Sequence, residues 1–199
     1  MKSAKFPLRV LLVAARQDKA TAVQQALLGA GHKMASTITP EDDLSTIVQR
    51  LQPDAIVAEV QAATRELLRG LRRAYERRPL PIVVFTDRSQ DDDIRAAIRA
   101  GVSSYVVDGL QPGRVIPVME TAVARFLEMQ ALRSERDEAI TKLNERRAIE
   151  RAKGILMRRR DLPEDAAYDV LRKMAMNRGR RMIEVAESII TAEQALAQS

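Results

Sequence analysis

Short apolar runs alternate with amphipathic stretches along the N-terminal half of the chain. The apolar runs lie at residues 8–13, 54–60 and 81–86, with weaker ones at 33–38 and 104–107. Between them, apolar residues recur at helical spacing over residues 18–30, 41–51, 63–76 and 90–101. Nearly all-apolar strands that alternate with helices are typical of a parallel sheet covered on both faces. The pattern therefore predicts a flavodoxin-like α/β fold, a five-stranded parallel sheet in the order 2-1-3-4-5.

From Pro112 onward the pattern becomes helical and continues without a strong break to about Arg160. Between Phe126 and Leu143 its apolar positions have broadly coiled-coil spacing, although two arginines interrupt them. Pairing of two chains through this helix is favoured over packing of the helix on its own domain. The sequence thus predicts a long connecting helix that forms a homodimer.

Three further amphipathic blocks between Ile149 and Ile190 predict a C-terminal all-α bundle of three helices. Asp161 is the expected N-cap of the second helix, and Gly179 is part of the expected stop signal between the second and third. The expected domain limits are 1–122 for the α/β domain, 123–144 for the linker helix and 145–199 for the bundle.

Composition excludes several kinds of chemistry. The chain has 199 residues, no Cys and a single His, so disulfides, thiolate catalysis and Cys- or His-rich metal sites are excluded. The pattern contains no nucleophile–base pair and no glycine loop for phosphates, so we expect no enzyme, no cofactor and no bound metal. Because neither a signal sequence nor a membrane-length apolar run is found, we expect a cytoplasmic protein.

Positive charge is concentrated near the C-terminus. From Glu145 to Met182 the chain carries twelve Lys or Arg residues against six Asp or Glu residues, and this surplus of six equals the net charge of +6 of the whole chain. Clustered cations are typical of proteins that bind a polyanion. A solvated cationic face without a partner is the alternative.

Several short motifs of this region occur together at fixed spacing. They are AKGILM at 152–157, AY at 167–168, LR at 171–172, AM at 175–176 and VA at 185–186. Together they resemble the ANTAR domain of bacterial transcription antiterminators. The resemblance implies a helical module that, usually as a dimer, captures a pair of small stem-loops in a nascent leader RNA and so prevents a terminator hairpin from forming.

We expect RNA contacts mainly from basic side chains of this module. The candidates are Lys153, Met157, Arg158, Arg159, Arg160, Tyr168, Arg172, Lys173, Arg178 and Arg180. Tyr168 is the only aromatic residue after Phe126, and it either stacks on a base or, as we favour here, packs in the core. The alanines of the motifs are expected at close-packing positions. A DNA-binding regulator of the response-regulator type, with the third helix in the major groove, is the main alternative function, and a scaffold for an acidic protein partner is another.

The N-terminal domain resembles a response-regulator receiver. Such a domain needs an acidic pair after the first strand for Mg²⁺, an Asp after the third as phosphoryl acceptor, a hydroxyl after the fourth and a Lys after the fifth. The residues at these places are Ala14 and Ala15, Glu59, Thr86 and Asp108, so only the hydroxyl is kept. We therefore expect a pseudo-receiver that accepts no phosphoryl group, with Glu59 as a solvated carboxylate at a loop. Imitation of a permanently phosphorylated Asp by Glu59 is the less favoured alternative, because no Lys remains to contact its charge.

The segments GVSSYVVDGL and ARFLEMQALRSERDEA resemble the nitrate- and nitrite-responsive antiterminators and the related amidase-operon regulators. In that group a ligand-sensing partner protein commonly sequesters the regulator. The resemblance therefore implies control by partner binding instead of phosphorylation, with leader stem-loops, a second copy of the chain and a sensor protein as partners.

Overall fold

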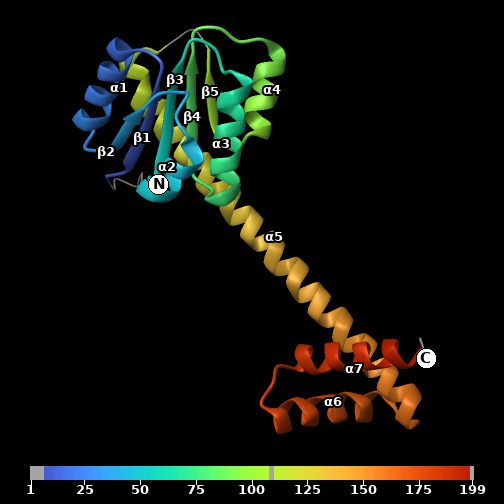
Figure 1. Ribbon diagram of the computed structural model, residues 1–199. Helices are drawn as coiled ribbons and strands as arrows, with labels where there is room; N and C mark the ends of the chain where they lie inside the picture. The colour runs from blue at the N-terminus through green and yellow to red at the C-terminus, as the bar shows by residue number, and fades with distance from the viewer. Residues whose placement is uncertain (1–6, 108–109, 198–199) are drawn as a thin grey trace. The chain divides into compact units, whose positions relative to one another are not determined.

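The computed structural model describes residues 7–107 and 110–197, and it divides into two units, Met1–Gln130 and Ala131–Ser199. A five-stranded parallel sheet in the order β2-β1-β3-β4-β5 forms the centre of the first unit (Figure 1). The strands are β1 (Arg9–Ala14), β2 (Lys33–Ile38), β3 (Ala55–Val60), β4 (Ile82–Thr86) and β5 (Ser104–Val106). Both the predicted fold class and the predicted strand order are confirmed.

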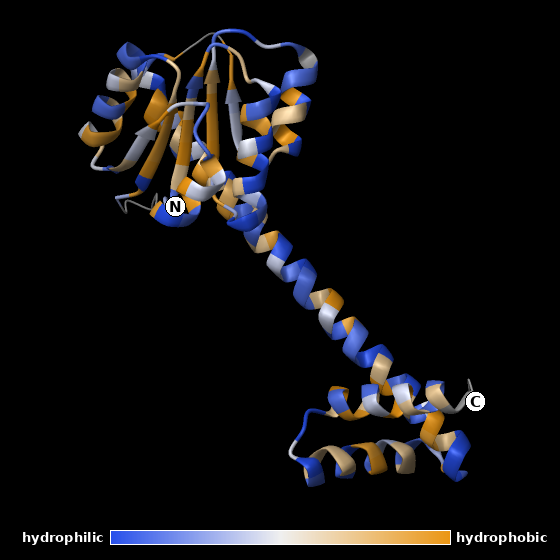
Figure 2. Cartoon of the chain, viewed as in Figure 1, coloured by the Kyte–Doolittle hydropathy of each residue, from blue (hydrophilic) through white to orange (hydrophobic). Residues whose placement is uncertain are grey.

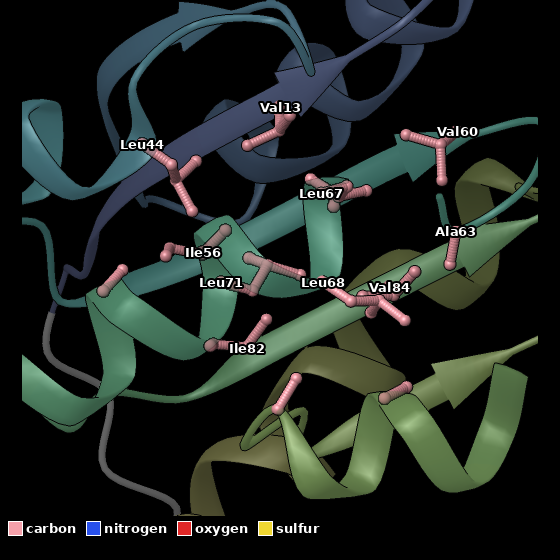
Figure 3. Close-up of a cluster of buried hydrophobic side chains, with 14 of the residues drawn as sticks. Val13, Leu44, Ile56, Val60, Ala63, Leu67, Leu68, Leu71, Ile82 and Val84 are labelled. Carbon is pink, nitrogen blue, oxygen red and sulfur yellow. The ribbon is translucent and has the colours of Figure 1, made fainter. Parts of the chain in front are cut away.

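Helices cover both faces of this sheet. They are α1 (Gln17–Gly29), α2 (Leu44–Leu51), α3 (Arg65–Arg77), α4 (Asp91–Arg99) and the N-terminal turns of α5 (Pro112–Arg160). One buried cluster packs the sheet against α2, α3 and α4, and Figure 3 shows part of it. The other packs the opposite face against α1 and α5.

Side chains alternate between the two clusters along each central strand. In β1, Leu11 and Val13 belong to the cluster beside α3, whereas Leu12 and Ala14 belong to the cluster beside α1. Both sets of positions must therefore be apolar, and Figure 2 shows the central strands as mostly hydrophobic. Each large side chain removed from water contributes roughly 1.5–3 kcal/mol to this core.

A glycine between α4 and β5 allows α3 to pack closely. Gly101 has a φ of +88°, and a Cβ there would lie 2.6 Å from the Tyr75 ring. The Tyr75 ring also meets Phe126 of α5 edge to face, with the ring centroids 6.4 Å apart. Phe126, which belongs to the predicted coiled-coil pattern, thus also packs within its own unit.

The second unit is a bundle of three helices, as predicted. It consists of the last turns of α5, α6 (Glu164–Arg178) and α7 (Met182–Ala197). Gly179 ends α6 in the left-handed conformation with a φ of 57°, which confirms the predicted stop signal. The N-cap prediction is wrong, because Asp161 has a φ of 50° at the end of α5 and the N-cap of α6 is Pro163. The chain reverses at Asp161 before the new helix begins.

α5 is unbroken from Pro112 to Arg160. The expected domain limits near residues 122 and 144 therefore both fall inside a helix, and they stay a prediction. No helix within the described ranges is long and apolar enough to cross a membrane.

Candidate nucleic-acid interface

Small side chains hold the three helices of the second unit together. Ala152, Ala167 and Ala186 are each 0% exposed, and Leu171 fills the space between them. Alanine brings helix axes close together because it has no side chain beyond Cβ. As expected, the motif alanines lie in the packed core.

Lys153 is buried beside the same core. Its side chain is 10% exposed, and its Nζ atom lies 2.6 Å from Glu150 Oε2 and 2.7 Å from Glu164 Oε1. Hydrogen bonds to Glu150 and Glu164 raise the pKa of Lys153 above its ordinary value. Because Glu164 is the first residue of α6, this pair of bonds ties the start of α6 to α5. In this arrangement the ammonium group faces carboxylates of its own chain.

The outer face of α6 carries a stripe of three exposed side chains, Tyr168, Arg172 and Met176. They follow one another at four-residue spacing and therefore lie in a row along the helix. Tyr168 is 42% exposed and Met176 is 72% exposed. The core position favoured for Tyr168 is wrong, because Ala167 and Leu171 occupy the buried side of the helix.

Exposed cations lie at both ends of α6. Arg158, Arg159 and Arg160 form the last turn of α5 just before it, while Arg178 and Arg180 lie at its far end. A helix of this length spans about 22 Å, so the predicted basic residues form two groups, with Lys173 between them. Arg159 is paired with Glu193 at 2.9 Å. The remaining predicted site residue, Met157, is half-buried against the core.

The place predicted for a degenerate phosphorylation site in the first unit contains a cluster of four charged side chains. Glu59 Oε1 lies 3.3 Å from an Arg16 nitrogen and 3.2 Å from Lys19 Nζ. Asp87 binds the same two cations, at 3.0 Å from Arg16 and 2.6 Å from Lys19. Burial alone would lower the pKa of Lys19, but its hydrogen bonds to Asp87 and Glu59 outweigh this and raise it. We call these four residues the ion-pair cluster.

Two expectations about this site are corrected. Glu59 is no solvated loop residue, because it lies within β3 and is 1% exposed. Cations also contact its carboxylate, although no Lys follows the fifth strand in the sequence. The hydroxyl of Thr86 lies 2.9 Å from the carbonyl oxygen of Gln61 and 2.8 Å from that of Arg88. Asp108 lies outside the described residues.

The sequence contained a signal for the ion-pair cluster that the motif comparison missed. A single carboxylate within the apolar strand AIVAEV needs a buried partner. Arg16 and Lys19 follow β1 and Asp87 follows β4, and the carboxyl ends of parallel strands meet at one edge of the sheet.

A cavity of about 950 Å³ opens beside this edge of the sheet. Its lining includes the acidic residues Glu41, Asp42, Asp43 and Glu66 together with Arg16 and Arg73. Carboxylates outnumber guanidinium groups there, so the electrostatic field disfavours the approach of an anionic phosphodonor.

Comparison with known proteins agrees with this division of the chain. Residues 137–190 match the ANTAR domain family. The transcriptional regulatory protein PdtaR of Mycobacterium tuberculosis is 29% identical over 94% of this chain and 91% of its own length. The nitrate regulatory protein of Klebsiella oxytoca is 38% identical, over 33% of this chain and 17% of its own length.

Among solved structures, the first unit is similar to a CheY-like response-regulator receiver domain protein from Methanospirillum hungatei. The TM-score is 0.54 at 14% identity, and the match covers 62% of this chain and 99% of the other. At this identity the likeness concerns the fold alone. The chain therefore joins a receiver-type α/β fold to a segment that matches the ANTAR domain family, and it is similar along nearly its whole length to a transcriptional regulatory protein.

Proposed function

We propose that this protein is an RNA-binding transcription antiterminator. Its second unit captures stem-loops of a nascent leader RNA, and this capture prevents a terminator hairpin from forming. A partner protein, and no phosphorylation step, decides when it acts. The ANTAR match over residues 137–190 supports the RNA target.

The observation that carries this proposal is the stripe of Tyr168, Arg172 and Met176 on α6. Tyr168 and Met176 are both exposed on the outer face of α6, one on each side of Arg172, although tyrosine and methionine often pack in a core. An aromatic ring next to a guanidinium group suits an unpaired base, and stacking contributes about 1–3 kcal/mol per base. Loops of RNA hairpins present such bases, whereas the bases of a duplex are stacked on each other.

Dimerisation through the linker is supported by apolar side chains of α5 that have no partner within the described chain. Between the core of the first unit and that of the second, five large side chains are about half exposed. They are Leu127, Met129, Leu132, Ile140 and Leu143. A second copy of the helix would cover them. Two bundles would then be held together, which suits a pair of stem-loops.

Control without phosphorylation is supported by the ion-pair cluster. The methyl groups of Ala14 and Ala15 cannot ligate a divalent cation, and one carboxylate oxygen of Glu59, Oε1, is held by Arg16 and Lys19. A receiver-type domain that lacks the residues for phosphorylation still has the fold and the exposed helix faces of a receiver. It is therefore suited to binding another protein.

RNA binding is tested by titrating the full-length protein against a leader stem-loop, against duplex DNA of the same sequence and against a polyanion competitor. We expect the stem-loop to bind more tightly and in a way that depends on loop sequence. Tyr168→Leu should weaken binding about tenfold because it removes the stacking ring, whereas Tyr168→Phe should retain most of the affinity.

Arg69→Glu, a charge reversal at an exposed residue of the first unit, provides the matched control for Arg172→Glu. Only the change at Arg172 should reduce RNA affinity. Tight binding to the duplex with indifference to the stem-loop would show that the protein is a DNA-binding regulator and would overturn the proposal.

A further inference from the structure

A glycine inside the last turns of α5 has no explanation within its own chain. A Cβ at Gly154 would meet only the side-chain tip of Arg158, at an ordinary contact distance of 3.7 Å. Glycine in a helix interior costs about 0.5–1 kcal/mol relative to alanine. Ala152, two residues earlier, shows that the core tolerates a methyl group where helices pack most closely. No contact among the described residues therefore requires a glycine at this position.

Three arginines surround this glycine on the outer side of the helix. Arg147, Arg151, Gly154 and Arg158 follow one another at intervals of four, three and four residues, so they share one face. This face is opposite the packed side that carries Ala152. From the first to the last of these residues the helix rises about 16 Å, which is long enough for several successive phosphates of one strand. We call these four residues the α5 stripe.

Unlike Arg159 and Arg181 of the same unit, the arginines of the α5 stripe have no counter-charge among the described residues. Within the part of the chain that the structure describes, none of the three forms a salt bridge. The nearby carboxylates are already used, because Glu150 binds Lys153 and Glu145 binds Arg181 at 3.7 Å. The α5 stripe is therefore a row of free positive charges with a gap in its middle.

We infer that the α5 stripe is a second RNA-contact surface, which holds the sugar–phosphate backbone while the α6 stripe meets unpaired bases. The inference rests on the proposed function and adds to it a site and a mode of contact. Phosphates would bind the three guanidinium groups, and the backbone would cross the helix at Gly154, where no side chain holds it away. A second copy of the same helix fits this face poorly, because the two rows of arginines would repel each other.

The decisive variant is Gly154→Ala, made in the full-length protein. Because the added methyl group meets only a flexible side-chain tip, the melting temperature should be unchanged or slightly higher. Affinity for the leader stem-loop should nevertheless fall about tenfold or more, since the backbone can no longer approach as closely. Gly29→Ala is the matched control, because a Cβ at this last residue of α1 meets no atom within 4 Å.

Arg147→Gln, Arg151→Gln and Arg158→Gln test the charges. Each should weaken stem-loop binding and reduce the slope of log K against log salt by about one, the signature of one lost phosphate contact. Arg69→Gln in the first unit should leave both the affinity and the slope unchanged.

Binding by the wild-type protein and binding by the α5 stripe variants test the proposed function and this inference separately. If the wild-type protein binds no stem-loop, the proposed function is wrong and the α5 stripe loses its ligand. If the wild type binds and Tyr168→Leu weakens binding, but the α5 stripe variants keep full affinity and slope, this inference alone is overturned. A Gly154→Ala protein that binds RNA normally but has an altered monomer–dimer equilibrium in sedimentation would assign the face to a second copy.

Discussion

Two regions of this molecule carry clustered basic side chains, but only one of them also contains the carboxylates that neutralise them. At the carboxyl edge of the sheet, Arg16 and Lys19 lie against Glu59 and Asp87, so two positive charges meet two negative ones. On the bundle, the arginines of the α5 stripe have no acidic neighbour left. The difference between a closed electrostatic site and an open one is whether the chain supplies the counter-charge.

Burial explains why the first region must be closed. A carboxylate that is 1% exposed, as Glu59 is, has lost its hydration and has to be paired. Arginines on a helix surface keep their water and need no partner for stability, since exposed ion pairs contribute only about 0–1 kcal/mol. The bundle can therefore leave its charges free for a ligand.

The largest effect is expected for a substitution that removes a cation from the ion-pair cluster. Lys19→Met leaves buried Glu59 with one cation, and we expect a loss of about 2 kcal/mol in the free energy of unfolding. Arg172→Glu should change that free energy by less than about 0.5 kcal/mol, because it alters only the open surface. Chemical denaturation, with hydrogen exchange to assign each loss to β3 or α6, measures both. Equal losses for the two variants would remove the contrast between the regions.

A smaller effect is expected at Lys153, a lysine of the bundle that is paired with carboxylates. Lys153→Met should lower the melting temperature of the second unit, since α6 loses its tie to α5 through Glu164. RNA affinity should fall, but the slope of log K against log salt should stay as in the wild type, because no phosphate contact is lost. A slope reduced by about one would show instead that Lys153 reaches the RNA directly.

The smallest effect is a pH dependence of the closed site. Hydrogen bonding to Lys19 lowers the pKa of Asp87 below its ordinary value of 3.8. The stability that this pair contributes is therefore full above pH 3.8 and is lost as the pH falls through the lower folded-state pKa. Lys19, with a pKa raised above 10.5, keeps its contribution up to that pH and loses it beyond the folded-state value.

The stability difference between the wild type and Lys19→Met should accordingly stay constant between these two limits and shrink below the acidic one. Denaturant titrations at a series of pH values measure this difference. A difference that changes near neutral pH would point to another titrating group.

The fold was predictable because it follows from periodicity. Strands buried on both faces give apolar runs, and five such strands alternating with helices fit a flavodoxin-like parallel sheet. α5 was predictable for the same reason, since no residue after its first turns breaks the helical pattern. Helix ends were harder, because Asp161 and Pro163 both suit a boundary and only the three-dimensional reversal decides between them.

The sites were less predictable, because they depend on pairing between residues far apart in the sequence. Comparison with a receiver motif drew attention to Glu59 but not to Lys19, which has no place in that motif. The exposure of Tyr168 could have been predicted from helical geometry. Ala167, Leu171 and Ala175 lie on the buried side, so the residue directly after Ala167 points outward. The pairing of Lys153 was not predicted, because the basic residues were counted without asking which carboxylates lie beside them.

A phosphorylated carboxylate is a mixed anhydride that water hydrolyses. In a receiver that uses one, the rate of this hydrolysis limits how long the activated state lasts. The carboxylate of Glu59 is a permanent part of the chain, and its two cations are permanent as well. Such a cluster contains no bond that water hydrolyses on the timescale of a signal. If this cluster stands in place of a phosphorylation site, as we propose, the duration of a signal through this protein is set by the lifetime of its complexes.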